Sequence, residues 1–561
     1  MLLLGLGPAC ESSSGISASL ISQGGSDSAG TTGETVGGAS AGGRRNSAGS
    51  GPSSSAGASS SAGASSRAGA SSSAGASSSA GASGGSVATG GTGASPGNGG
   101  ANMGGSNSAG RAGAATGSGG SAGQVVGAGG STGTGSFPLK LSSNKRYLVD
   151  QQNVPFLINQ ASSWGLIQSL SEADAAGYLD ALKQRGFNTV MVSIVSYDTR
   201  MAGKPPNWQG TSPFKVQWDY STYDEAYFAH ADRVIDLAKD RGMLVTLVPS
   251  YLGYASEPNQ GWFDELLGAN NSVAKSLAYG RFLGQRYKNF GNIIWVAGGD
   301  NTPAAGSELE NRLKAIIDGI RENDSHLWTA HWDSVGHGNG VASTENPTFA
   351  SYMSLNGYYA YDYNLTYQRD LGFYNRTPAM MMFHLDQSYE GEAGGTPDNI
   401  RRKAYDVMLM GGAGSSFCAG QNWWGFLNWK TSMDTPGTQQ TTLWYRLFAS
   451  RHWYELVPDQ DHTAVTAGLG EWGSLDYVAA ARTASGSTLM AFLPSSRKVT
   501  VDMTKLSGAQ AKAWWYNPSN GQSTSLGTFP TTGTKDFTPP SAGDWLLVID
   551  DASLGFGAPG T

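Results

Sequence analysis

Short apolar segments recur through the middle of the chain, and each one runs directly into a polar or aromatic residue. In a barrel of alternating strands and helices the catalytic groups sit where strands end, so this pattern bears on a site as well as a fold. The carboxylates that matter below end the sequences IIWVAGGD and MMMFHLD. The five clearest segments are Phe187–Val195, Met243–Pro249, Asn292–Asp300, Leu327–Asp333 and Ala379–Asp386.

Segments with helical spacing of apolar residues alternate with these predicted strands. The first begins with the capping pattern S-E-A-D at Ser171 and stops at Gly186. Three further apolar runs complete the series of strands, at Pro155–Gln160, Phe349–Tyr359 and Gly414–Trp424. Eight strands predict an α/β fold, a (β/α)8 barrel over residues 137–460. The predicted helices are Ser171–Arg185, Tyr223–Arg241, Ser272–Phe290, Leu309–Asn323 and Ile400–Leu409.

The spacing of apolar residues changes after Val465. From there, short runs of alternating apolar and polar residues are separated by turn signals such as Asn520-Gly521. This pattern predicts a small all-β sandwich domain over residues 461–552, followed by a loose tail over 553–561. Its predicted strands are Tyr477–Arg482, Thr488–Leu493, Val499–Met503, Ala511–Tyr516 and Trp545–Ile549.

The first quarter of the chain has a different composition. From Glu11 to Gly135 it is almost wholly Ser, Gly, Ala and Thr, and the first aromatic residue of the chain is Phe137. The sequence SSSAGA repeats five times between Ser53 and Ala82, once with Arg67 in place of a serine. Such a stretch has too little apolar surface to offset the entropy of ordering it. We therefore expect a flexible low-complexity linker over residues 11–136.

The linker follows the short apolar run MLLLGLGPAC, which ends in Cys10. Ala9 is a small residue of the kind that precedes the lipid-modified cysteine of bacterial lipoproteins, although a basic start is missing. We expect residues 1–10 to be a signal or lipoprotein remnant, or an unremarkable N-terminus. The first reading places the protein outside the cytoplasm, secreted or held at a bacterial surface, with a membrane reached only through Cys10.

The remaining composition excludes several classes of function. The net charge is −7 and no basic cluster occurs, so nucleic acid is not an expected partner. Beyond the linker no apolar run approaches 18 residues, so no membrane span is predicted. Cys418 is the only cysteine besides Cys10, which excludes a disulfide framework and makes Cys418 a buried small hydrophobe.

The strand-end carboxylates are the candidate catalytic groups. Cleavage of a glycosidic bond needs two carboxyl groups on opposite sides of the anomeric carbon, one to protonate the leaving oxygen and one to attack or to activate water. Asp300 ends the fourth strand, whereas Asp386 and Glu390 follow the seventh, across the mouth of a barrel. The alternative for Asp300 is a turn or helix-cap role, and for the other two it is a solvated loop carboxylate.

Aromatic residues at strand ends supply the other half of a predicted sugar site, because the apolar faces of sugar rings lie flat on such rings. Each ring alone is more often a core residue than a sugar platform, but their common position at strand ends favours a carbohydrate cleft. The histidines show no H-E-x-x-H spacing, and beyond the linker no G-x-S-x-G elbow occurs, so we expect neither a metal site nor a serine hydrolase, and no cofactor. The candidate substrate-binding residues are Trp164, His331, Trp332, Tyr359, Tyr389, Trp423 and Trp424.

Several motifs together resemble a known family. The segments NIIWVAGGDNTP, DQSYEG, RRKAYDVMLMGGAGSSF and SRHWYELVPDQ resemble the apiosidase-like glycoside hydrolases. The C-terminal AWWYNPSNGQ and FTPPSAGDWLLVID are similar to the β domain that accompanies them, which carries a collagen-binding label. The resemblance implies a (β/α)8 barrel that cleaves a glycosidic bond, as in removal of an apiose-containing unit from pectic side chains.

The resemblance also assigns roles to residues. The family's Gly-Gly-Asp corresponds to Gly298, Gly299 and Asp300, which makes Asp300 the acid/base. The second carboxylate lies in a Glu-Pro-x-Tyr-Glu pattern, which here reads Asp386-Gln387-Ser388-Tyr389-Glu390. Asp386 would attack, with Glu390 assisting or replacing it.

Two functional hypotheses follow. The first is an extracytoplasmic, tethered glycoside hydrolase that acts on plant or microbial polysaccharide. The second is a non-catalytic surface protein whose β domain binds glycan or matrix. Its best support is Asp386, which stands where the family pattern has Glu.

Overall fold

The computed structural model describes residues 136–196, 207–253, 261–336, 340–361, 364–392 and 394–561. The predicted lipid attachment at Cys10 and the predicted linker up to residue 135 lie outside these ranges.

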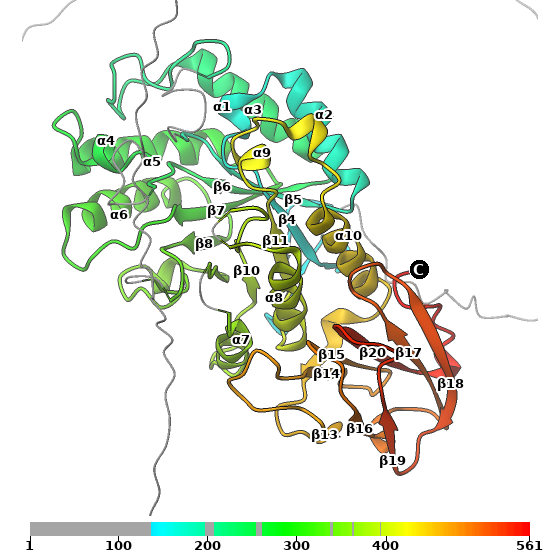
Figure 1. Ribbon diagram of the computed structural model, residues 1–561. Coiled ribbons are helices and arrows are strands. Elements are labelled where there is room, and N and C mark those ends of the chain that lie inside the picture. The colour runs from blue at the N-terminus through cyan, green and yellow to red at the C-terminus, as the bar shows by residue number, and fades with distance from the viewer. Residues whose placement is uncertain (1–135, 197–206, 254–260, 337–339, 362–363, 393) are drawn as a thin grey trace, which may run out of the picture. The chain divides into compact units, whose positions relative to one another are not determined.

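Eight parallel strands occur among the described residues. Six form a sheet in the order β11-β4-β5-β6-β7-β8, and β9 pairs in parallel with β10 (Figure 1). At both junctions a backbone N–H continues the ladder: Leu355 donates to the carbonyl of Trp328 at 3.1 Å, and Ala413 to that of Met382 at 3.0 Å. This curved parallel sheet fits a (β/α)8 fold. The strands are β4 (Ile158–Ser162), β5 (Thr189–Ser193), β6 (Leu244–Val248), β7 (Ile293–Gly298), β8 (Trp328–His331), β9 (Asn356–Tyr358), β10 (Met382–His384) and β11 (Gly414–Phe417).

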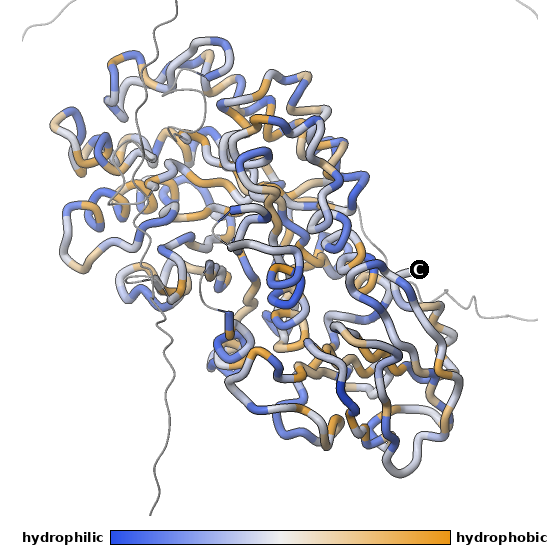
Figure 2. The backbone as a smooth tube through the Cα atoms, in the orientation of Figure 1, coloured by the Kyte–Doolittle hydropathy of each residue, from blue (hydrophilic) through white to orange (hydrophobic). Residues whose placement is uncertain are grey.

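The five predicted helices are present, and the side chain of Ser171 caps the first of them as predicted, accepting from the N–H of Asp174. Figure 2 shows hydrophobic and hydrophilic positions alternating along these helices, as expected where one face is buried. None of the helices in the described part of the chain is long and apolar enough to span a membrane. The five are α2 (Glu172–Gln184), α3 (Glu225–Asp240), α5 (Val273–Tyr287), α6 (Glu308–Arg321) and α8 (Pro397–Leu409).

Other elements were not predicted from the sequence. The segment Phe349–Tyr359 is a strand only at its end, because Phe349, Tyr352 and Met353 have helical spacing and surround the 3-10 helix Ala350–Tyr352. Likewise Gly414–Trp424 contains both β11 and α9, and Pro155–Gln160 is divided between two strands. The remaining elements are α1 (Leu166–Ser169), α4 (Phe263–Leu267), α7 (Thr366–Tyr374), α9 (Gln421–Trp424), α10 (Pro436–Ala449), β1 (Lys140–Leu141), β2 (Leu148–Val149) and β3 (Pro155–Phe156).

The C-terminal domain consists of two antiparallel sheets around a shared core that includes Val465, Val501, Leu489 and Leu547. All five predicted strands are present, whereas β18 and β19 were missed because their residues are largely polar and exposed. The first sheet holds β12 (Leu456–Pro458), β14 (Ala479–Thr483), β15 (Thr488–Leu493), β20 (Trp545–Asp551), β17 (Gln510–Tyr516) and β18 (Ser523–Pro530); the second holds β13 (Val465–Ala467), β16 (Val499–Asp502) and β19 (Thr534–Phe537).

The β domain packs against the barrel helices through specific contacts. The ring of Tyr405 on α8 stacks on that of Phe492, with centroids 4.9 Å apart. Arg451, which follows α10, forms a buried ion pair with Asp550 at 2.9 Å. The same guanidinium lies over the ring of Phe556 and donates to the carbonyl of Gly557 at 2.9 Å. The prediction of a loose tail over 553–561 is therefore wrong, because a buried cation holds the tail in place.

Candidate active site

The end of strand β7 has a backbone that glycine makes possible. Gly298 has φ +87°, Gly299 has φ +116°, and Asp300 follows in the left-handed region at φ +56°. A Cβ on Gly298 would lie 2.6 Å from the carbonyl oxygen of His331, and one on Gly299 would lie 2.8 Å from the ring of Tyr251. The Gly-Gly pair therefore lets the chain turn between strands β6 and β8 and aims Asp300 at the strand ends.

We expect the Gly299→Ala substitution to destabilise the protein by about 2 kcal/mol, since it combines an unfavourable φ with a clash. Activity should fall as well, because Asp300 is the next residue. Gly306→Ala is the matched control: Gly306 also has a positive φ, at +73°, but a Cβ there would meet nothing within 4 Å. Urea unfolding of the two variants measures the difference, and an equal loss of stability would contradict a tight fit at Gly299.

Two tyrosine hydroxyls hold the carboxyl group of Asp300. Tyr251 donates to Oδ2 at 2.6 Å, and Tyr359 donates to Oδ1. Burial raises the pKa of the Asp300 carboxyl above its ordinary value; contact with His331 and with the two hydroxyls opposes this rise, and the charge of Asp386 adds to it. A carboxyl group with a raised pKa keeps its proton to higher pH, as a general acid must.

Asp386, two residues beyond strand β10, is the more deeply buried carboxylate, at 1% exposure against 9% for Asp300. Its Oδ1 accepts from the hydroxyl of Ser162 at 2.7 Å and from the N–H of Gln387 at 3.0 Å. Its Oδ2 accepts from the hydroxyl of Tyr389 at 2.5 Å. Burial and the charge of Asp386 raise the pKa of Tyr389 well above its ordinary value, so this phenol remains a donor.

The imidazole of His331, at the end of strand β8, lies between the two carboxyl groups. Nδ1 is 3.5 Å from Oδ1 of Asp300, and Nε2 is 3.4 Å from Oδ2 of Asp386. The backbone N–H of Asp300 donates to Nδ1 at 3.2 Å, so the ring proton belongs on Nε2 and points to Asp386. Both carboxyl groups thus contact the same ring, which brings them close together, as the two carboxyl groups of a glycosidase must be.

Trp164, which follows strand β4, links the two halves of this cluster. Its ring lies 4.8 Å from that of Tyr251 and stands edge-on to His331 at 4.9 Å. Its Nε1 donates to the hydroxyl of Tyr389 at 2.8 Å. On the other side the ring of Tyr359 stacks on His331 at 4.2 Å. Of the predicted aromatic residues, Trp164, Tyr359 and Tyr389 are therefore brought together around the carboxylates.

The other three predicted tryptophans are buried side chains with different partners. Trp332 is buried against Phe349 and donates to the carbonyl of Ser343 at 3.3 Å. Trp423 is fully buried and packs on Tyr178 of α2, at 6.1 Å. Trp424 is buried as well, and its Nε1 lies 3.2 Å from both carboxylate oxygens of Glu392.

Glu390 points to the start of helix α10. Its Oε1 accepts from the N–H of Gly437 at 3.1 Å, and its Oε2 accepts from the hydroxyl of Thr435, the N-cap residue. A negative charge at this position is favourable, because the N-terminus of a helix carries a partial positive charge. Of the two candidate second carboxylates, the structure places Asp386 beside Asp300 and His331, and Glu390 at a helix terminus.

Comparison with known sequences identifies the family of this chain. The family model described as "Apiosidase-like, catalytic domain" matches residues 142–455, more than half of the chain. The chain belongs to the apiosidase-like family. It is a glycoside hydrolase, and the resemblance drawn from its motifs is confirmed. A second model, "Putative collagen-binding domain of a collagenase", matches residues 457–550.

Two solved structures resemble this apiosidase-like protein in fold. A glycoside hydrolase family 5 protein from Bacteroides vulgatus is 21% identical, with a TM-score of 0.63 over 75% of this chain and 95% of that chain. Another, described as a glycoside hydrolase, is 23% identical, with a TM-score of 0.63 over 75% of this chain and 98% of that chain. No curated protein sequence matches the chain.

Two residues of the apiosidase-like site, Ser162 and Tyr251, were not predicted from the sequence. Both lie at or just beyond the carboxyl end of a barrel strand, β4 and β6 respectively, which is the signal that could have found them. Among the described residues, no three His, Cys, Asp or Glu side chains are grouped as metal ligands.

The Glu390→Gln substitution is expected to change kcat less than tenfold and to cost about 0.5 kcal/mol of stability, because it removes a charge from a helix N-terminus. Steady-state kinetics and thermal unfolding check both values. A loss of activity far larger than the loss of stability would place Glu390 in the chemistry instead.

Proposed function

We propose that the protein hydrolyses a glycosidic bond with Asp300 as the general acid and Asp386 as the group that attacks the anomeric carbon or activates water. Asp300 gives its proton to the departing oxygen as the bond to the sugar breaks. As that bond breaks, Asp386 either bonds to the anomeric carbon or removes a proton from the water that does. In the first case, water then displaces Asp386 from the sugar, with the Asp300 carboxylate taking the proton of that water. The observation that carries this proposal is the pair of contacts from the two carboxyl groups to the two nitrogens of His331.

The change from the family pattern at residues 386 and 387 is consistent with this role for Asp386. Aspartate reaches less far than glutamate by one methylene, yet Oδ2 of Asp386 contacts both Tyr389 and His331. The N–H of Gln387, which a proline at that position would lack, donates to Oδ1. The shorter carboxylate therefore gains a hydrogen bond that orients it.

The substrate we propose is a polysaccharide of plant or microbial origin, with a pectic side chain that carries apiose or a related pentose as the first choice. Membership of the apiosidase-like family supports this choice. The N-terminal sequence supports an extracytoplasmic site of action, with the Ser/Gly/Ala linker as a tether and Cys10 as the site of lipid attachment. Polymeric substrates are found outside the cytoplasm, which agrees with such a tether.

Sugar release from pectic, arabinan and xylan oligosaccharides by wild type, Asp300→Ala and Asp386→Ala tests the proposal. We expect wild type to release sugar from at least one of these substrates, and neither variant to do so at a comparable rate. Binding of a glycan by wild type without release from any substrate would favour the non-catalytic binding protein.

A further inference from the structure

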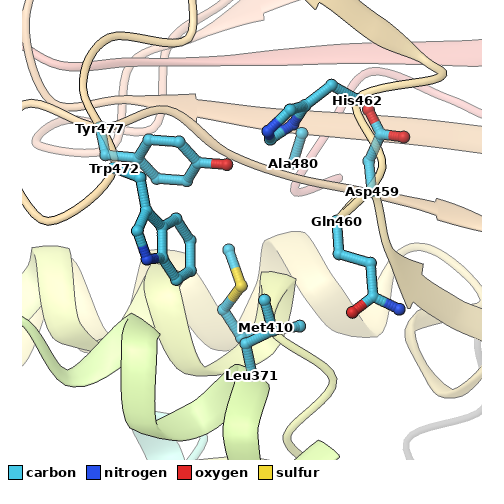
Figure 3. Close-up of a pocket in the computed structure, with 8 residues that line it drawn as sticks. All are labelled: Leu371, Met410, Asp459, Gln460, His462, Trp472, Tyr477 and Ala480. Carbon is cyan, nitrogen blue, oxygen red and sulfur yellow. The ribbon is translucent and has the colours of Figure 1, made fainter. Parts of the chain in front are cut away.

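A cavity lies between the barrel helices α7 and α8 and the β domain, with a volume of about 120 Å³. Leu371 and Met410 form its apolar floor, and aromatic and polar side chains from the β domain form its walls (Figure 3). Helix α8 runs back from the carboxyl ends of the strands, and Met410 follows its last turn just before strand β11 begins. This cavity is therefore at the amino ends of the strands, on the opposite side of the barrel from Asp300 and Asp386.

Trp472 in this cavity is exposed but held in place. Its side chain is 45% exposed, although large apolar side chains are usually buried. The rings of Tyr367 and Tyr477 stand nearly perpendicular to it, with centroids 5.0 and 4.9 Å away. The hydroxyl of Tyr367 accepts from the N–H of Gly473 at 2.8 Å, which ties the loop of Trp472 to helix α7. The ring thus has little freedom to lose when a ligand binds.

Polar side chains face Trp472 and Tyr477 across the cavity. Figure 3 shows Gln460 and His462 on the wall opposite the two aromatic rings. The loop that carries them is rigid: the carboxylate of Asp459 accepts from the N–H groups of Ala464 at 3.0 Å and Val465 at 2.7 Å. Asn375 of the barrel donates to the amide oxygen of Gln460 at 2.8 Å, which fixes that side chain.

We propose that this cavity is a second glycan site, which holds one sugar unit of the polysaccharide that is cleaved at the barrel mouth. This proposal rests on the proposed function only for which polysaccharide binds. A sugar ring has an apolar face that packs on Trp472, an edge that meets Tyr477, and hydroxyls that bind an amide and an imidazole. The mixed lining favours a sugar over a proline-rich peptide, which would use the rings but leave the opposite wall without partners. Such a site would hold the tethered enzyme on its polymer between cleavage events.

Native electrophoresis of the full chain in gels that contain arabinan, rhamnogalacturonan, xylan or gelatin tests this site. All variants carry Asp386→Asn, so that the polymer is not degraded. We expect at least one polysaccharide to retard the Asp386→Asn protein, which is the parent of the other variants. Adding Trp472→Ala should weaken that binding about tenfold. Trp472→Phe should retain most of the binding. Leu475→Ala is the matched control, since Leu475 lies in the same loop and is 54% exposed but does not line the cavity.

Several results would overturn the proposal: no retardation of the parent by any polysaccharide, unchanged retardation of Trp472→Ala, or an equal loss in Leu475→Ala. Retardation by gelatin alone that depends on Trp472 would assign the cavity to a peptide instead. In the active enzyme, Trp472→Ala should cleave a short oligosaccharide at the wild-type rate. Absence of cleavage by wild type would count against the proposed hydrolysis. The gels would still show whether the cavity at Trp472 binds a polysaccharide.

Discussion

The Asp386→Asn variant is expected to release sugar about 10⁴-fold more slowly than wild type. An amide has nearly the shape of a carboxylate but cannot attack the anomeric carbon or accept a proton from water. Its nitrogen would also face the donor groups of Ser162, Tyr389 and His331, which now point at carboxylate oxygens. Comparison of kcat/KM on the best substrate of the panel measures this loss.

Glu390→Gln is the matched control for this experiment, because it makes the same chemical change four residues away. Glu390 contacts the N-terminus of helix α10, so its substitution should leave most of the activity. Circular dichroism and thermal unfolding establish that both variants fold. If the Asp386→Asn variant kept more than a tenth of wild-type activity, Asp386 would not be the group that attacks the anomeric carbon or activates water.

The Asp300→Asn variant is expected to lose about 10³-fold in rate on natural glycosides, whose leaving oxygen needs a proton. The loss should be far smaller on an aryl glycoside with an acidic phenol as leaving group, since such a phenolate departs without protonation. A residue that only shaped the site would slow both substrates to the same degree. Equal losses on the two substrates would therefore contradict the role of Asp300 as an acid.

The pH dependence of wild type follows from the raised pKa of Asp300. The protonated carboxyl is the active form of a general acid, so kcat/KM should fall as the pH rises through this raised pKa. Because burial shifts that pKa upward, the fall should begin at a higher pH than an ordinary aspartate would give. In Asp300→Asn this alkaline limb should be absent.

The strand ends could be predicted from the sequence, because each apolar segment stops at a polar or aromatic residue. Asp300 and Asp386 were candidates for that reason. The contacts between them could not be predicted, since they join residues 162, 251, 331 and 386 from four different strands. Trp332 and Trp423 follow strands as Trp164 does, yet only the three-dimensional packing decides which ring turns toward the carboxylates.

Chemical rescue by azide tests the central claim most directly, namely that Asp386 is the carboxylate that reacts at the anomeric carbon. Removing the side chain in Asp386→Ala leaves space for a small anion beside the sugar. We predict that azide restores part of the lost rate in Asp386→Ala and gives a glycosyl azide as product. Rescue of Glu390→Ala instead, or near wild-type activity of Asp386→Ala without azide, would contradict the account.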